Sequence, residues 1–102
     1  MPLTQITEYQ VQYSANKFPP HIWLKNGTKP IGQLIFMADA ASPLPADGVS
    51  GGQVNLYYHL EDFQNAFRLL SGEKVVYLLY NGSGPGFENG IQTSPDPLGN
   101  LP

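Results

Sequence analysis

The sequence predicts an α+β domain in which a curved, mostly antiparallel sheet of about five strands carries one helix, at about residues 60–71, on one face. Three observations lead to this prediction. Some segments alternate apolar and polar residues with the period of a strand. Two others are apolar at nearly every position, as in strands covered on both faces. Only one segment has the apolar spacing of an amphipathic helix. A small, partly open β-barrel plugged by that helix is the alternative architecture.

The first predicted strand covers residues 6–13, where Tyr9, Val11 and Tyr13 alternate with polar side chains. Its polar face favours an edge position or a solvated side. The next two strands, at 21–25 and about 28–38, are expected to form a hairpin around Asn26-Gly27. Asn-Gly is typical of a type I′ turn, because both residues tolerate a positive φ angle. In this register Ile22 faces Ile31, Trp23 faces Pro30 and Lys25 faces Thr28.

Residues 39–52 are predicted to form a long loop, and a strand at 53–59 follows it. The helix comes next and is expected to end at Gly72. The last strand is expected at 74–80. The connection at 60–73 is just long enough for a right-handed parallel crossover, although an antiparallel arrangement stays open.

The two apolar runs, at 34–38 and 75–80, need cover on both faces, and one helix covers only one. We expect the second face to be covered by the tail, by a curled sheet or by a second subunit. Residues 81–102 are rich in turn residues. Asn89-Gly90 is predicted to form a small hairpin that lays Phe87 and Ile91 over the sheet. We therefore expect one globular domain at 1–93 and a disordered tail at 94–102.

Composition excludes several classes of function. The net charge is −3 and only 13% of the 102 residues are charged, which argues against nucleic-acid binding. There is no cysteine, so disulfides, thiolate metal sites and cysteine nucleophiles are excluded. No segment is long and apolar enough to span a membrane, and the N-terminus lacks the pattern of a signal peptide. We expect a soluble, cytoplasmic protein.

Two glycine-rich segments resemble functional motifs only superficially. Residues 48–52 match Gly-x-Ser-x-Gly, but a loop precedes them and a strand follows, unlike the turn that carries a hydrolase nucleophile. Residues 82–86 lack the helix and lysine of a phosphate-binding loop. Both segments are interpreted as a linker or a turn. The only two histidines are far apart in the sequence, so no metal site and no cofactor are expected.

The best candidate for a small-molecule site lies where the strand at 53–59 ends. His59 stands at the start of the helix, where the helix dipole disfavours a charged imidazolium. If the strands at 53–59 and 74–80 are parallel, His59 shares a strand-end edge with Asn81 and Ser83, and with Tyr57 and Tyr80 nearby. The alternative is that His59 helps to cap the helix.

The sequence favours a non-enzymatic binding or interaction module that forms a homodimer through an apolar sheet face. The six tyrosines, five phenylalanines and one tryptophan support a subunit interface or a platform for a sugar or planar ligand. The alternative is a small-ligand-binding protein or minor enzyme that uses the edge near His59 and the 81–86 loop. The expected partners are a second copy, another protein or a small molecule, with no nucleic acid and no membrane.

Overall fold

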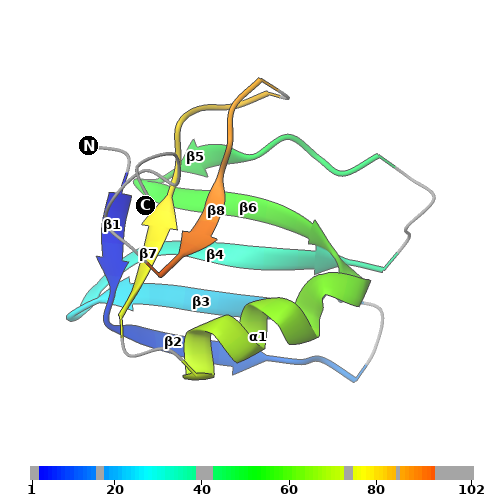
Figure 1. Ribbon diagram of the computed structural model, residues 1–102. Coiled ribbons are helices and arrows are strands. Elements are labelled where there is room, and N and C mark those ends of the chain that lie inside the picture. The colour runs from blue at the N-terminus through cyan, green and yellow to red at the C-terminus, as the bar shows by residue number, and fades with distance from the viewer. Residues whose placement is uncertain (1–2, 16–17, 39–42, 73–74, 85, 94–102) are drawn as a thin grey trace, which may run out of the picture.

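The computed structural model describes residues 3–15, 18–38, 43–72, 75–84 and 86–93 (Figure 1). The predicted tail, residues 39–42 of the predicted long loop and Lys74 at the start of the last predicted strand lie outside the described residues. In chain order the elements are β1 (Leu3–Ile6), β2 (Glu8–Gln12), β3 (His21–Asn26), β4 (Lys29–Met37), β5 (Gly48–Ser50), β6 (Gln53–His59), the 3₁₀ helix η1 (Leu60–Asp62), α1 (Phe63–Gly72), β7 (Val76–Leu79) and β8 (Gly90–Gln92).

The strands form two sheets (Figure 1). The five-stranded sheet has the order β2-β3-β4-β6-β5, and the three-stranded sheet has the order β1-β7-β8. All neighbouring strands are antiparallel except β4 and β6, which are parallel. With one α-helix among the described residues, this arrangement confirms the predicted fold class. The described strands close no barrel, so the alternative architecture is not the one observed. β2 is an edge strand, as its polar face predicted.

The last predicted strand lies in the second sheet. The strand expected at 74–80 is β7, and it pairs with β1 and β8 rather than with β6. A parallel crossover between β6 and β7 is therefore absent, because β4 and β5 already occupy the two edges of β6. The shared strand-end edge on which the predicted site depended is not formed.

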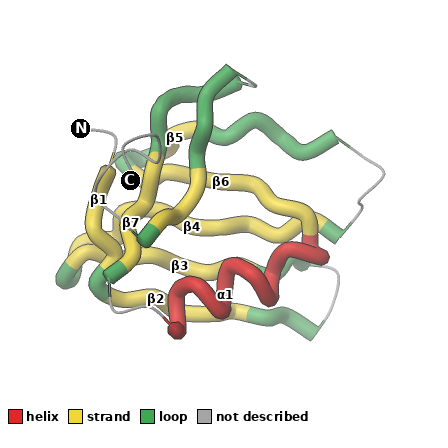
Figure 2. The backbone as a smooth tube through the Cα atoms, viewed as in Figure 1, coloured by secondary structure: helices red, strands yellow, loops and turns green. Residues whose placement is uncertain are grey.

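One face of the five-stranded sheet is covered by α1 and by the three-stranded sheet together (Figure 2). The chain itself thus supplies a second covering element besides the helix. Phe36 lies in the core between these layers, with its ring centroid 4.9 Å from that of Phe63 and 5.5 Å from that of Tyr58. The buried core cluster consists of Ile6, Ile22, Leu24, Ile31, Leu34, Phe36, Leu56, Ala66, Leu70, Val76 and Leu78.

Gly32 allows close approach of the neighbouring strand β6 and of one side chain from the other sheet. A Cβ atom at this position would lie 2.5 Å from the carbonyl oxygen of Val54 and 3.3 Å from Cδ2 of Leu78. The first distance is shorter than real contacts of this kind, and the atom concerned belongs to the backbone. Glycine is therefore required here for the close approach of β6 and β7 to β4.

The hairpin of β3 and β4 is present, but its turn lies one residue later than predicted. Asn26 pairs with Lys29, so Gly27 and Thr28 form the two-residue turn. Gly27 has a φ of +63°, and no described non-glycine residue has a positive φ. This pattern matches a type II′ turn rather than the predicted type I′ turn, which would need a positive φ at both central positions.

A β-bulge changes the predicted register further. The register shifts between Leu24 and Lys25, and Ile31 becomes the extra residue on β4. The proline at the start of β4 has no N–H group to donate to the ladder, which favours an irregular pairing there. As a result Ile22 faces Leu34, and the predicted pairing of Ile22 with Ile31 is wrong.

A second hairpin lies within the predicted 39–52 loop and joins β5 to β6. Ser50 pairs with Gln53, and the turn between them consists of Gly51 and Gly52. Their φ angles are +60° and +79°, as a type I′ turn requires at both central positions. The Gly-x-Ser-x-Gly pattern is thus a strand end followed by a hairpin turn, in which Ser50 is exposed.

The helix ends at Gly72, as predicted, and packs against the aromatic side of β2. The rings of Tyr9 and Phe67 meet edge to face at 6.2 Å, and those of Tyr13 and Phe63 at 5.4 Å. Because side chains alternate along a strand, the glutamines of β2 point to the opposite face of the sheet.

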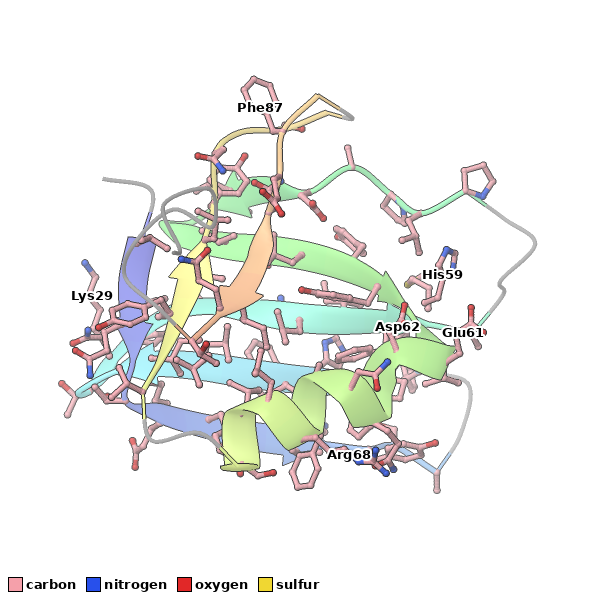
Figure 3. The ribbon with its side chains drawn as sticks, in the orientation of Figure 1. Lys29, His59, Glu61, Asp62, Arg68 and Phe87 are labelled. Carbon is pink, nitrogen blue, oxygen red and sulfur yellow. The ribbon has the colours of Figure 1, made fainter. Side chains whose placement is uncertain are left out.

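The small hairpin predicted with its turn at Asn89-Gly90 is not formed, because Gly90 is the first residue of β8 and pairs with Leu79 of β7. The chain reverses instead through the longer connection between Leu79 and Gly90. Ile91 packs against the core, as expected. The expectation for Phe87 is wrong, because this side chain is 52% exposed and lies at the outer end of the connection (Figure 3). Its ring lies beside Gly82 instead, within contact distance of that backbone.

Candidate functional site

The five-stranded sheet turns one face away from α1 and from the three-stranded sheet, and no described helix or strand covers it (Figures 1 and 2). We call this surface the open face. Ile35 marks it, because this residue is only 8% exposed and yet lies outside the core cluster between the layers. The alternation of the strands places on the open face Glu8, Gln10, Gln12, His21, Trp23, Lys25, Gln33, Ile35, Met37, Gln53, Asn55, Tyr57 and His59.

A row of side-chain hydrogen bonds crosses three strands of the open face. Nδ1 of His21 lies 2.9 Å from Oε1 of Gln33, and Nε2 of Gln33 donates to Oδ1 of Asn55 at 3.0 Å. An amide oxygen only accepts, so Nδ1 of His21 carries the donated hydrogen. The row is therefore oriented from His21 towards Asn55, and the amide NH₂ of Asn55 is left as a donor at its end.

Trp23 lies next to this row. Its ring is stacked on that of His21, with a centroid separation of 5.5 Å and an interplanar angle of 13°. The indole Nε1 donates to Oε1 of Gln12 at 3.4 Å. Both contacts fix the orientation of the indole, so a large flat apolar surface is held in place beside polar groups.

A hollow of about 230 Å³ adjoins Trp23. Amide side chains from two strands, Gln10 on β2 and Gln53 on β6, line it from opposite sides. Of the lining residues that the structure describes, Lys25 is the only charged one, and the others are Leu24 and Pro30. The open face therefore combines an aromatic plate, several amides and one ammonium group around a shallow depression.

The predicted site residues are divided between the two sheets. Tyr57 and His59 lie on β6, whereas Tyr80, Asn81 and Ser83 follow β7. Figure 3 shows His59 at the end of β6 next to the helix, well apart from Phe87 in the segment that joins β7 to β8. Tyr80 packs against the core and Ser83 is exposed. The structure thus does not bring His59 together with Asn81 and Ser83.

A polar cluster that sequence reasoning missed links β6 to the connection between β7 and β8. Asp47 accepts the backbone N–H of Tyr57 at 2.9 Å and the side-chain NH₂ of Asn89 at 3.0 Å. Asn89 also accepts the backbone N–H of Asn81 at 2.8 Å and donates to the carbonyl of Gly82 at 2.8 Å. We call these residues the Asp47–Asn89 clasp. It brings Tyr57 near the 81–86 loop, beside a groove of about 290 Å³ whose lining includes Tyr57, Asp47 and Gly84.

His59 does not cap the helix with its side chain. It is the N-cap residue of η1, but its side chain makes no capping hydrogen bond. Its Nδ1 is buried and has no hydrogen-bond partner among the described residues. His59 therefore stands at the N-cap position, as the alternative interpretation expected, but its side chain supplies no capping hydrogen bond.

The sequence contained part of the signal for the open face, because alternation separated the two sides of its strands. It did not show which side chains from different strands would lie together there. Alternation placed Asn55, Tyr57 and His59 on one side of their strand, and the open face is this side. Gln33 is the central residue of the row, but it precedes an apolar run and its partners come from two other strands. Only the register of β3, β4 and β6 brings them together.

The described residues contain no group of three or more histidine, aspartate or glutamate side chains placed to hold a metal ion. In the same part of the chain no helix is long and apolar enough to cross a membrane. Comparisons with family models, with curated proteins and with solved structures found no match to this chain.

Proposed function

We propose that this protein is a non-enzymatic binding module whose open face binds an uncharged, hydroxyl-rich ligand such as a glycan. The observation that supports this most strongly is the oriented row of His21, Gln33 and Asn55 beside the fixed indole of Trp23. Amides and imidazole offer both donors and acceptors, which is what hydroxyl groups need. The indole offers an apolar plate for the C–H face of a sugar ring.

The arrangement favours binding over catalysis. A histidine that acts as a general base is usually oriented by a carboxylate, which stabilises the imidazolium that forms. Here His21 donates to the neutral amide of Gln33 instead. The row therefore fixes side-chain positions in advance, which lowers the entropy lost when a ligand binds.

The charge distribution supports a neutral ligand. The open face carries one ammonium group, Lys25, and its cross-strand neighbour is Glu8, so the two charges lie together at one end. The rest of the face bears amides, aromatic rings, a methionine and Ile35. A polyanion such as nucleic acid would need several cationic side chains on this face.

A second copy of the chain is the other candidate occupant, as the sequence predicts. Five strands at about 4.8 Å spacing and about six residues at about 3.3 Å rise give a flat area of roughly 480 Å². A stable protein–protein interface buries about 800 Å² on each partner. We therefore expect self-association through the open face alone to be weak, and the predicted homodimer remains a proposal.

The single tryptophan of the chain provides the test, because Trp23 lies in the proposed site. Titration with neutral mono- and oligosaccharides is expected to give a saturable change in tryptophan emission. Asn55→Ala removes the donor at the end of the row and should weaken binding about tenfold, the equivalent of one lost hydrogen bond of about 1.4 kcal/mol. Phe87→Ala is the matched control, since Phe87 is exposed and belongs to the other sheet's connection.

Two results would overturn the proposal. The first is that no neutral saccharide changes the tryptophan emission. The second is that the Asn55→Ala variant binds the saccharide as tightly as the unmodified protein does. Sedimentation velocity on the same samples identifies the other occupant. If the emission changes with protein concentration alone and a dimer forms that Asn55→Ala disrupts, the open face serves self-association instead.

A further inference from the structure

A second cavity lies on the opposite side of the five-stranded sheet, between α1 and β8. Its volume is about 270 Å³, and its lining comes from β6, from the helical segment that directly follows it and from the more distant β8. β6 contributes Tyr58, β8 contributes Ile91, and the helical segment contributes the rest. Among the described residues the lining consists of Tyr58, Asp62, Asn65, Ala66, Leu69 and Ile91.

The helical residues follow the spacing of one helix face. Asp62, Asn65, Ala66 and Leu69 recur at intervals of three and four, so they form a continuous strip along the cavity. Ala66 is 7% exposed and gives this strip a small side chain at its centre. The small side chain leaves room for a ligand between the helix and β8.

Three polar groups line this cavity without partners. Within the described ranges, the hydroxyl of Tyr58, the carboxylate of Asp62 and the amide of Asn65 make no hydrogen bond or ion pair with the protein. The Tyr58 hydroxyl also lies close to the backbone, since a Cβ atom at Gly90 would be 3.3 Å from it. The three groups are therefore available to a ligand.

We propose that this cavity binds a small organic amine, with the ammonium group at Asp62, a second polar contact at the Tyr58 hydroxyl and the hydrocarbon against Leu69 and Ile91. Asp62 is the only charged group among the described lining residues, so a ligand with one positive charge neutralises it without leaving an unpaired partner. The volume lies just below the usual range for drug-sized ligands, about 300–1,000 Å³, so a single ring or a short chain fits best.

The environment of Tyr58 agrees with this assignment. Burial, together with the charges of Asp47 and Asp62, raises the pKa of the Tyr58 hydroxyl to about 12. The phenol therefore stays protonated near neutral pH and presents both a donor and an acceptor. The negative potential that opposes its ionisation is also the potential that attracts an ammonium group.

The probes are phenethylamine and 2-phenylethanol, which share a shape and differ in charge. Both are titrated into the isotope-labelled full chain, and amide chemical shifts are followed by NMR. The amine is expected to shift the amides of the lining residues and to bind at least tenfold more tightly than the alcohol. The difference should shrink at 1 M salt, because salt screens the charge at the partly exposed Asp62.

Variants separate the charge from the cavity itself. Asp62→Asn should reduce the affinity for the amine to that for the alcohol. Glu61→Gln is the matched control, because Glu61 is the neighbouring exposed acid and does not line the cavity, and it should change binding less than twofold. Leu69→Trp should fill the cavity and weaken both probes, and the spectra themselves show whether each variant is folded.

Equal affinity for the amine and the alcohol would overturn the proposal. Chemical-shift changes confined to residues outside the lining would do the same, as would the absence of any change at tens of millimolar amine. None of these results bears on the proposed function, because the cavity and the open face lie on opposite sides of β6. Emission of Trp23 should accordingly stay unchanged when the amine binds.

Discussion

Replacement of Gly32 by alanine should destabilise the protein strongly, although it adds only one methyl group. The new Cβ would lie 2.5 Å from the carbonyl oxygen of Val54 and 3.3 Å from Cδ2 of Leu78. A flexible side chain could move away, but the carbonyl belongs to a strand held on both sides by β4 and β5. The strain must therefore be met by separating β4 from β6 or by bending β6.

The expected cost follows from these distances. Overpacking of a well-packed core typically costs about 1–3 kcal/mol, and a rigid backbone atom puts this case at the upper end. The loss of glycine entropy in the unfolded chain offsets about 0.4–1 kcal/mol of it. We expect a net loss of about 2 kcal/mol, which lowers Tm by roughly 8 °C or more in a domain of this size.

Urea and thermal unfolding, followed by far-ultraviolet circular dichroism, measure this loss. Gly48→Ala is the matched control, because Gly48 also lies in a strand and nothing lies within 4 Å of its added Cβ. That variant should stay within about 0.5 kcal/mol of the unmodified protein. If Gly32→Ala is as stable as Gly48→Ala, the close approach at Gly32 does not exist as described.

Four further predictions follow from individual contacts. Phe36→Ala should cost about 3–5 kcal/mol in urea unfolding, because Phe36 is 0% exposed and its cavity is lined by other core rings. Between pH 10 and 12 unfolded Tyr58 loses its proton while folded Tyr58 keeps it, so the free energy of unfolding should fall by up to about 3 kcal/mol as pH rises through this window. The Tyr58→Phe variant should lack that part of the loss. Urea unfolding at several pH values compares the variant with the unmodified protein. Asp47→Ala should cost about 1–3 kcal/mol and accelerate hydrogen exchange at the backbone N–H of Tyr57, which loses its acceptor. Asn26, Asn81 and Asn89 each precede glycine and each donate a side-chain hydrogen bond, so peptide mapping after ageing should find slower deamidation in the folded protein than in the urea-unfolded chain.

Local patterns predicted the individual elements well. The apolar spacing that begins at Leu60 and ends before Gly72 gave the helix, and alternation gave β2 and β6 with the correct faces. These signals work because a strand or helix buries one side whatever its partner is. The β5–β6 hairpin was missed although Gly51-Gly52 is itself a common hairpin turn, since the small residues before it were interpreted as a linker.

The arrangement of the elements depends on pairings that no local pattern contains. The run in β7 is apolar on both sides, which predicts that both faces are covered. It does not identify the elements that cover them. The turn after Asn26 lies one residue later than predicted, and the bulge at Ile31 shifts the register of the rest of the hairpin further. In the same way, Gln33 became part of a candidate site only through its hydrogen bond with Asn55. Asp47 joined the polar cluster only through its hydrogen bond with Asn89, which is 42 residues away in the sequence.

The pairing of β1 with β7 sets an order on synthesis of this protein. Ile6 is opposite Val76, so β1 must wait for about 70 further residues to be synthesised before its partner exists. At about 5–20 residues per second, that wait lasts several seconds. During it the inner side of the nascent five-stranded sheet lacks the cover that Leu78 and Ile91 later provide. A chaperone that binds exposed apolar strands would therefore find its substrate in this interval, and a stalled chain that ends before residue 76 should remain bound to it.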